Sequence, residues 1–175
     1  MLAHVVGLAD DDAGLTVLDL TDPALPTLLA SVPFATAYGV AVAGDYAYVA
    51  TGSGHGSYAG GLLIIDIRRP QTPTLTGNYA ITSWHSFAWG VAVTGDFAYV
   101  TASHPLDDHG YLEVIHVSSP ENPTLAGVAS TAGYGVDVAV AENRAYVATA
   151  GSVLKVFDVS NPHDPALVHP PFCRV

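Results

Sequence analysis

The chain has 175 residues, which is enough for one compact domain with its own apolar core. Half of the residues are hydrophobic (50%) and only 12% are charged, which excludes a disordered chain, while 17 glycines and 12 prolines indicate many turns. The net charge of −11 repels phosphate backbones and anionic membrane surfaces, so no nucleic acid partner is expected.

The first repeat unit, about residues 1–36, begins with an apolar strand near Leu2 to Leu8. A second apolar strand, ending in an acidic residue and two prolines, spans Gly14 to Pro26. A third begins directly after the second proline and is predicted at a sheet edge, because proline cannot donate to a strand ladder. The acidic run Asp10 to Asp12 lacks the spacing of a calcium loop and is expected to form a solvated turn.

The second unit, about residues 37–83, shows the complete pattern of four strands. A hairpin starts at Tyr38, and its two-residue loop Gly44-Asp45 is of the kind that adopts positive φ. Its first strand contains small residues, which suit a crowded central axis. The next strand, within Gly61 to Pro73, is almost continuously apolar, which predicts a sheet covered on both faces.

The third and fourth units, about residues 84–131 and 132–175, repeat this pattern. Their hairpins start at Trp89 and Tyr134, and the last one uses Glu142-Asn143 where the others use Gly-Asp. A sandwich would not repeat one four-strand motif, and the coils of a solenoid are shorter. The sequence therefore predicts an all-β chain: a β-propeller built from about four four-stranded antiparallel blades.

The first blade is predicted to lack its innermost strand, which leaves fifteen strands in all. Three arrangements fit this count: a piece of a longer chain, half of an eight-bladed ring made by two chains, or a four-bladed ring. In the first two the apolar edge near Leu2 to Leu8 has no partner strand. We therefore expect self-association.

The strand with its acidic end and two prolines, together with the hairpin YGVAVAGDYAYVA, resembles the LVIVD repeat family of β-propellers. The resemblance extends from about Leu2 to Phe172, although His116 stands where the other units have Asp19, Asp66 and Asp158. It implies an extracellular or cell-surface scaffold with no catalytic signature shared by the repeats. Met1 to Asp12 lacks the pattern of a secretory signal, and no window is long and apolar enough for membrane insertion.

The candidate site lies on one face of the predicted ring, where two loops are unusually long. These loops, Gly52 to Gly60 and Ser103 to His109, open on the same face as the connection that carries both tryptophans. Aromatic residues are enriched at interfaces, so this face is a candidate surface for a ligand or partner. The candidate ligand-binding residues are His55, Tyr58, Trp84, His85, Trp89, His104, Asp107 and His109.

The leading interpretation is a non-enzymatic propeller module that binds a protein, glycan or small ligand, or serves as an assembly scaffold, without a cofactor. One alternative is a metal-dependent enzyme with histidine ligands on the long loops, although these histidines lack the spacing of a metal motif. A purely structural self-assembling repeat is the other. No hydrolase or phosphate-binding motif occurs, and Asp19, Asp66 and Asp158 are expected to cap turn amides. The pair Arg68-Arg69 is expected to be solvated, and the single Cys173 cannot form an intrachain disulfide.

Overall fold

The computed structural model describes residues 5–10, 14–34, 36–52, 60–81, 87–103, 109–151 and 153–168, with only the backbone described for residues 5–10. All regular secondary structure in these ranges is β-strand, as the repeat pattern predicts. The strands are β1 (Val5–Asp10), β2 (Gly14–Asp19), β3 (Thr27–Val32), β4 (Ala37–Ala43), β5 (Tyr46–Thr51), β6 (Gly61–Asp66), β7 (Thr74–Ala80), β8 (Phe87–Thr94), β9 (Phe97–Ser103), β10 (Gly110–His116), β11 (Thr124–Ser130), β12 (Gly135–Ala141), β13 (Arg144–Thr149), β14 (Val153–Asp158) and β15 (Ala166–Leu167).

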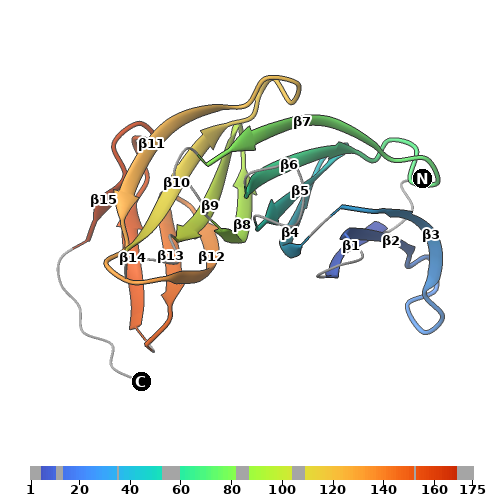
Figure 1. The fold of residues 1–175 in the computed structure, drawn as a ribbon, viewed down its shortest axis with the longest axis horizontal. Helices are drawn as coiled ribbons and strands as arrows, with labels where there is room; N and C mark the ends of the chain where they lie inside the picture. Colours follow the sequence, from blue (N-terminus) through green and yellow to red (C-terminus); the bar gives the residue numbers. More distant parts are fainter. Residues whose placement is uncertain are drawn as a thin grey trace.

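These strands form four antiparallel sheets in chain order, which we call the first to fourth blades. The first blade has the order β1-β2-β3, and the others are β4-β5-β6-β7, β8-β9-β10-β11 and β12-β13-β14-β15. The blades fan out in an open arc, with β1, β4, β8 and β12 on its inner side and β3, β7, β11 and β15 on its outer side (Figure 1). The first and last blades lie at opposite ends, so the described blades do not close into a four-bladed ring.

Among the described residues the first blade has three strands, one fewer than the second and third blades, as predicted. Within this part of the chain its edge strand β1 pairs with β2 alone, from Val5 opposite Asp19 to Asp10 opposite Gly14. In the fourth blade the outer strand β15 is shorter than expected, and its only Cα partners are Phe157 and Asp158 of β14. The strand pattern of the second and third blades is complete, as the sequence predicts.

Two-residue loops close the hairpins on the inner side of the arc. Gly44 and Gly95 occupy the first loop position with φ of 58° and 55°, and Glu142 takes the same position with φ of 53°. This region of backbone space suits glycine because it has no Cβ. The predicted hairpins are confirmed, and the fourth blade accepts a strained residue where the two before it use glycine.

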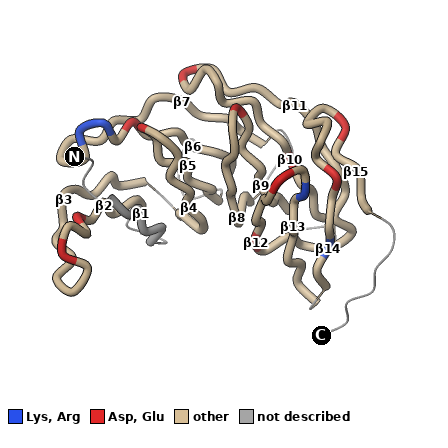
Figure 2. The backbone as a smooth tube through the Cα atoms, turned by 180° about the vertical axis from the view of Figure 1, so that it is seen from behind, with Lys and Arg blue, Asp and Glu red and all other residues tan. Residues whose placement is uncertain are grey.

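The strands β2, β6, β10 and β14 are the third strands of the four-strand repeat, because the first blade lacks the first one. The acidic residues that end β2, β6 and β14 cap the turns that follow, as expected. The amide nitrogens of Thr21, Arg68 and Ser160 donate to the Oδ1 atoms of Asp19, Asp66 and Asp158 at 2.8, 2.9 and 3.0 Å. In the third blade His116 takes this place, and its Nε2 lies 3.2 Å from Ser118 Oγ. Acidic residues mark several of the turns along the backbone (Figure 2).

The core consists of three apolar clusters, each lying between two successive blades. In each cluster a pair of aliphatic residues from the third strand of one blade packs against the next blade. The pairs are Leu15 and Val17, Leu62 and Ile64, and Leu112 and Val114. Stacking of blades, rather than a single central core, therefore removes most apolar area from water.

The inner strands approach one another closely because small residues face the axis. A Cβ on Gly39 would lie 2.6 Å from the carbonyl oxygen of Trp89, and a Cβ on Gly90 would lie 2.7 Å from the Cα of Asp137. Asp137 pairs with Ala148 as Gly39 pairs with Ala50. The two extra residues of the last hairpin thus place Asp137, and not Gly135, at the position that Gly39 and Gly90 hold in the second and third blades.

One carboxylate is buried between the second and third blades. Glu113 of β10 is 8% exposed, and the Tyr79 hydroxyl hydrogen-bonds to its carboxyl group. The Oε2 atom of Glu113 is buried and has no hydrogen-bond partner among the described residues. Desolvation raises the pKa of Glu113 above its ordinary value, and the bond from Tyr79 offsets part of this shift.

Candidate ligand-binding rim

We call the edge of the arc where the second strands end and the first strands begin the loop rim. At this edge the amide of Gly52 donates to the carbonyl of Thr36 at 3.0 Å, and that of Thr131 donates to the carbonyl of Gly110 at 2.8 Å. At the opposite edge the amides of Ile67 and Val117 donate to the carbonyls of Asp45 and Asp96 in the two-residue hairpin loops. The hairpin loops and the loop rim therefore lie at opposite edges of the sheets, as the repeat predicts.

Three half-buried aromatic side chains from two blades gather at the loop rim. The ring centroids of Tyr38 and Trp89 are 4.6 Å apart with an interplanar angle of 24°, and those of Phe87 and Trp89 are 5.7 Å apart. Tyr38 and Phe87 complete the cluster at 6.2 Å. Tyr38 belongs to β4 and the other two belong to β8, so the cluster exists only because the blades stack.

The aromatic cluster is held in place by polar and steric contacts. Trp89 Nε1 donates a hydrogen bond to Ser103 Oγ at 2.6 Å, which fixes the indole at the end of β9. A Cβ on Gly52 would lie 2.7 Å from both Tyr38 and Phe87, so the rings rest directly on this backbone. The cluster is therefore preorganised, and a ligand would lose little side-chain entropy there.

Two of the predicted site residues fall within the described residues. Trp89 lies at the loop rim, and His109 immediately precedes Gly110, whose Cα pairs with Ser103. Ser103 accepts the Trp89 bond, so both residues lie at the same end of the third blade. The others are outside the described residues: His55, Tyr58, Trp84, His85, His104 and Asp107.

The structure adds Tyr38 and Phe87 to the candidate site. Trp89, predicted at the end of a connection and as the first residue of a hairpin, lies inside β8, which begins two residues earlier at Phe87. Tyr38 was not singled out as a ligand-binding candidate, although Tyr38 and Trp89 occupy the same place before a glycine in their hairpins. That repeated aromatic-glycine pair is the signal that could have identified the cluster.

The alternative of a metal-dependent enzyme stays a prediction. Among the described residues, no group of three or more His, Cys, Asp or Glu side chains is placed to hold a metal ion. Three of the histidines on which the alternative depends, His55, His85 and His104, lie outside them.

Comparison with known protein families assigns the chain. The LVIVD repeat matches residues 8–33, 36–81, 87–131 and 132–170, which together cover most of the sequence. The chain belongs to the LVIVD repeat family. A search of curated proteins found no match.

Three solved structures similar to this LVIVD repeat chain are a designed protein, a β-propeller domain and a candidate enzyme. The computationally designed Ika4 protein is 11% identical with a TM-score of 0.66, over 91% of this chain and 88% of that one. The Cps50 (Swd1) β-propeller domain of Myceliophteria thermophila is 18% identical with a TM-score of 0.67, and 95% of this chain covers 55% of it. A candidate 6-phosphogluconolactonase from Bacteroides uniformis is 17% identical with a TM-score of 0.65, and 94% of this chain covers 51% of it. These identities support the fold alone, and the chain spans about half the length of the last two.

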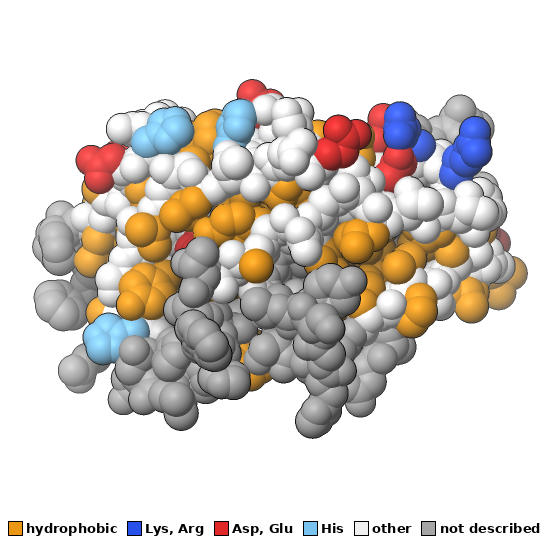
Figure 3. Space-filling model, turned by 45° about the horizontal axis from the view of Figure 1, so that its top comes forward, with side chains coloured by type: hydrophobic (Ala, Val, Ile, Leu, Met, Phe, Trp, Pro, Cys, Tyr) orange, Lys and Arg blue, Asp and Glu red, His pale blue; other side chains and the backbone are white. Residues whose placement is uncertain are grey.

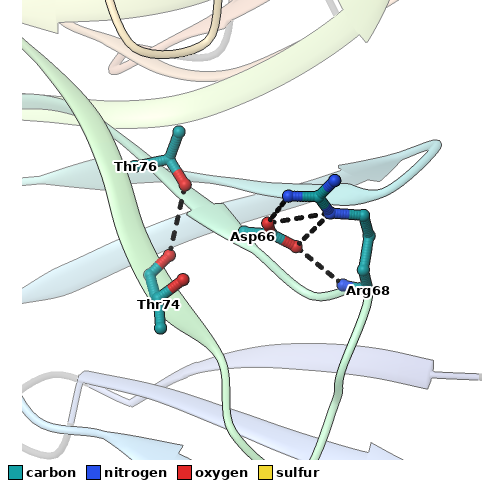
Figure 4. Close-up of polar contacts among 4 residues, drawn as sticks. All are labelled: Asp66, Arg68, Thr74 and Thr76. Atoms are coloured by element: carbon teal, nitrogen blue, oxygen red, sulfur yellow. Dashed lines mark hydrogen bonds and ion pairs between the residues drawn. The ribbon is translucent and has the colours of Figure 1, made fainter.

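The face opposite the loop rim carries a hollow beside an ion pair. Arg68 Nε donates to Asp66 Oδ1 and Oδ2 at 3.1 and 2.9 Å, and its Nη2 also pairs with Oδ2 (Figure 4). This bond lowers the pKa of Asp66. Both Arg68 and Arg69 are exposed, as expected, and Arg68 is in addition ion-paired.

The hollow beside this ion pair has a volume of about 520 Å³ and is lined by Asp66, Arg68, Arg69, Thr72 and Thr74. Basic side chains appear at one end of this surface, beside acidic ones (Figure 3).

Proposed function

We propose that this LVIVD repeat chain is a non-enzymatic recognition scaffold whose loop rim binds a neutral glycan. The observation that carries the proposal is the cluster of Tyr38, Phe87 and Trp89, which is half-buried and shared by two blades. Sugar rings present apolar faces that pack on aromatic side chains, and aromatic residues are enriched where proteins meet ligands.

The charge of the chain narrows the class of ligand. A net charge of −11 disfavours anionic ligands at long range, so a neutral glycan fits better than a sulfated or phosphorylated one. No cofactor is needed for such binding. Repeats that stack into a rigid arc hold the aromatic cluster in a fixed geometry, which is the property that a recognition scaffold requires.

We expect Trp89→Ala to lower the affinity for a neutral glycan at least about tenfold, because the indole is the ring shared by both stacking contacts. The purified chain is applied to an array of neutral glycans, and the strongest binder is titrated by calorimetry. Quenching of tryptophan fluorescence by the same glycan gives an independent measurement.

Phe97→Ala is the matched control for Trp89→Ala. Phe97 is a half-buried aromatic residue of the same blade, but it lies at the opposite end of β9 beside His116, with ring centroids 5.2 Å apart. Its replacement should leave the affinity unchanged. Equal losses in both variants, or no neutral glycan bound by the wild-type chain, would contradict the proposal.

A further inference from the structure

All four blades carry the same pair of aliphatic residues on their third strand, but only three of these pairs are covered. The covered side chains, six in number, are at most 1% exposed, and each pair packs against the following blade: Leu15 and Val17, Leu62 and Ile64, Leu112 and Val114. In the fourth blade the equivalent residues are Leu154, which is 44% exposed, and Val156, which is half-buried. The fourth blade therefore keeps the residues of a blade interface on a face that no described blade covers.

A tyrosine on the neighbouring strand repeats the same contrast. Tyr48 and Tyr99 lie opposite Ile64 and Val114 in the strand register, and they are 5% and 3% exposed. Tyr146 lies opposite Val156 and is 37% exposed. Residues opposite each other in an antiparallel pair share one face of the sheet. We call the surface formed by Tyr146, Leu154 and Val156 the end face.

The first blade presents the complementary surface. In the later blades two apolar residues flank the last residue of the third strand, which is Asp66, His116 or Asp158, and pack against the preceding blade. All six side chains are buried: Ile65 and Ile67, Ile115 and Val117, Phe157 and Val159. Leu18 and Leu20 hold these positions in the first blade, where both are only half-buried. We call the surface formed by Leu18 and Leu20 the start face.

We propose that the end face of one copy of this chain binds the start face of a second copy, so that two arcs close head to tail. The chain holds both halves of an interface that it already forms three times internally, and the two halves lie at the two ends of the arc (Figure 1). A pairing of unlike surfaces forms a ring when the rotation closes.

The extent of the arc supports a second copy as the partner that would complete a ring. The match to the Cps50 (Swd1) β-propeller domain covers 95% of this chain but only 55% of that one, so one copy has the extent of about half of such a ring. Two arcs of four blades give about eight blades, the upper end of the usual range for propellers. This inference does not depend on the glycan proposed for the loop rim, because its surfaces lie on other faces of the blades.

Light scattering behind a sizing column tests the proposal on the purified chain. The wild-type protein should elute as a dimer of about 36 kDa, twice the 18.1 kDa of one chain. Leu154→Glu should weaken the dimer at least tenfold, because it places a charge in an apolar contact. Leu125→Glu is the matched control, since Leu125 is similarly exposed (49%) but lies on the outer strand β11, and it should stay dimeric.

Mixing two variants distinguishes head-to-tail contacts from other contacts. Leu18→Glu and Leu154→Glu each disrupt both contacts of the ring and should be monomeric at concentrations where the wild type is dimeric. An equimolar mixture should form dimers again, with lower affinity than the wild type, because one intact end face meets one intact start face while the second contact stays disrupted. Circular dichroism checks that each variant is folded, and Leu20→Glu replaces Leu18→Glu if that variant does not fold.

Three results would overturn the proposal. One is a wild-type chain that stays near 18.1 kDa at every concentration. Another is a Leu154→Glu variant that dimerises like the wild type. The third is a mixture that stays monomeric even at the highest concentration measured, where a single intact contact should be populated.

Discussion

Replacing Tyr99 with alanine should lower the free energy of unfolding by about 3 to 4 kcal/mol, as expected for a large aromatic side chain removed from a packed core. Tyr99 is 3% exposed and belongs to the cluster that joins the third and fourth blades, with Val138 and Val147 of the next blade. The loss should appear in denaturant titrations followed by circular dichroism, as a lower midpoint.

Tyr146→Ala is the matched control for this experiment, because Tyr146 has the same place in the last blade but is 37% exposed. It should cost less than about 1 kcal/mol. Both substitutions are best measured in the Leu154→Glu background, where association of two chains does not contribute to stability. Similar losses for Tyr99 and Tyr146 would mean that blades do not cover one face of each sheet as described.

Replacing Glu113 with glutamine should stabilise the protein by about 1 kcal/mol at pH 7, because it removes the desolvation cost of a buried carboxylate charge. Burial raises the folded-state pKa of Glu113 above its ordinary value of 4.5. The protonated group therefore contributes its full stability below the pKa of the unfolded chain, and this contribution is lost as the pH rises through the folded-state pKa. Thermal unfolding of both proteins from pH 4 to pH 8 measures the difference.

The difference in stability between the wild type and Glu113→Gln should therefore become small toward pH 4 and grow toward neutral pH. Glutamine can still accept the hydrogen bond from Tyr79, so the packing of the site is retained. Glu121→Gln is the control, because Glu121 is exposed in the turn of the same blade and its replacement should leave the stability at pH 7 unchanged. A difference in stability that stays constant from pH 4 to pH 8 would show that Glu113 does not titrate in a buried site.

The blade could be predicted from the sequence because its signals are local. The turn at Gly44-Asp45 needs a positive φ at its first residue, and Asp66 reaches an amide two residues away. Each signal lies within a few residues of its structural consequence. The hairpin turn and the aspartate cap each occur in three blades, and this repetition makes the propeller fold predictable from one chain.

The candidate site was only partly predictable because it forms between blades. Tyr38 and Trp89 are far apart in the chain, and their stacking depends on the close approach of β4 and β8 at Gly39. The replacement of glycine by Asp137 is hidden by the two extra residues in its hairpin. Similarly, Glu113 stands in a strand that was read as apolar, and its burial follows from the position of the preceding blade.

The account rests on sheets that stack face to face around the inner side of the arc. Nuclear Overhauser contacts in methyl-labelled protein test this most directly. Ring protons of Tyr99 should show contacts to methyl groups of Val138 and Val147, which share its cluster but belong to the fourth blade. Contacts from Tyr99 to methyl groups of its own sheet alone would contradict blade stacking, and the aromatic cluster at the loop rim would lose its basis.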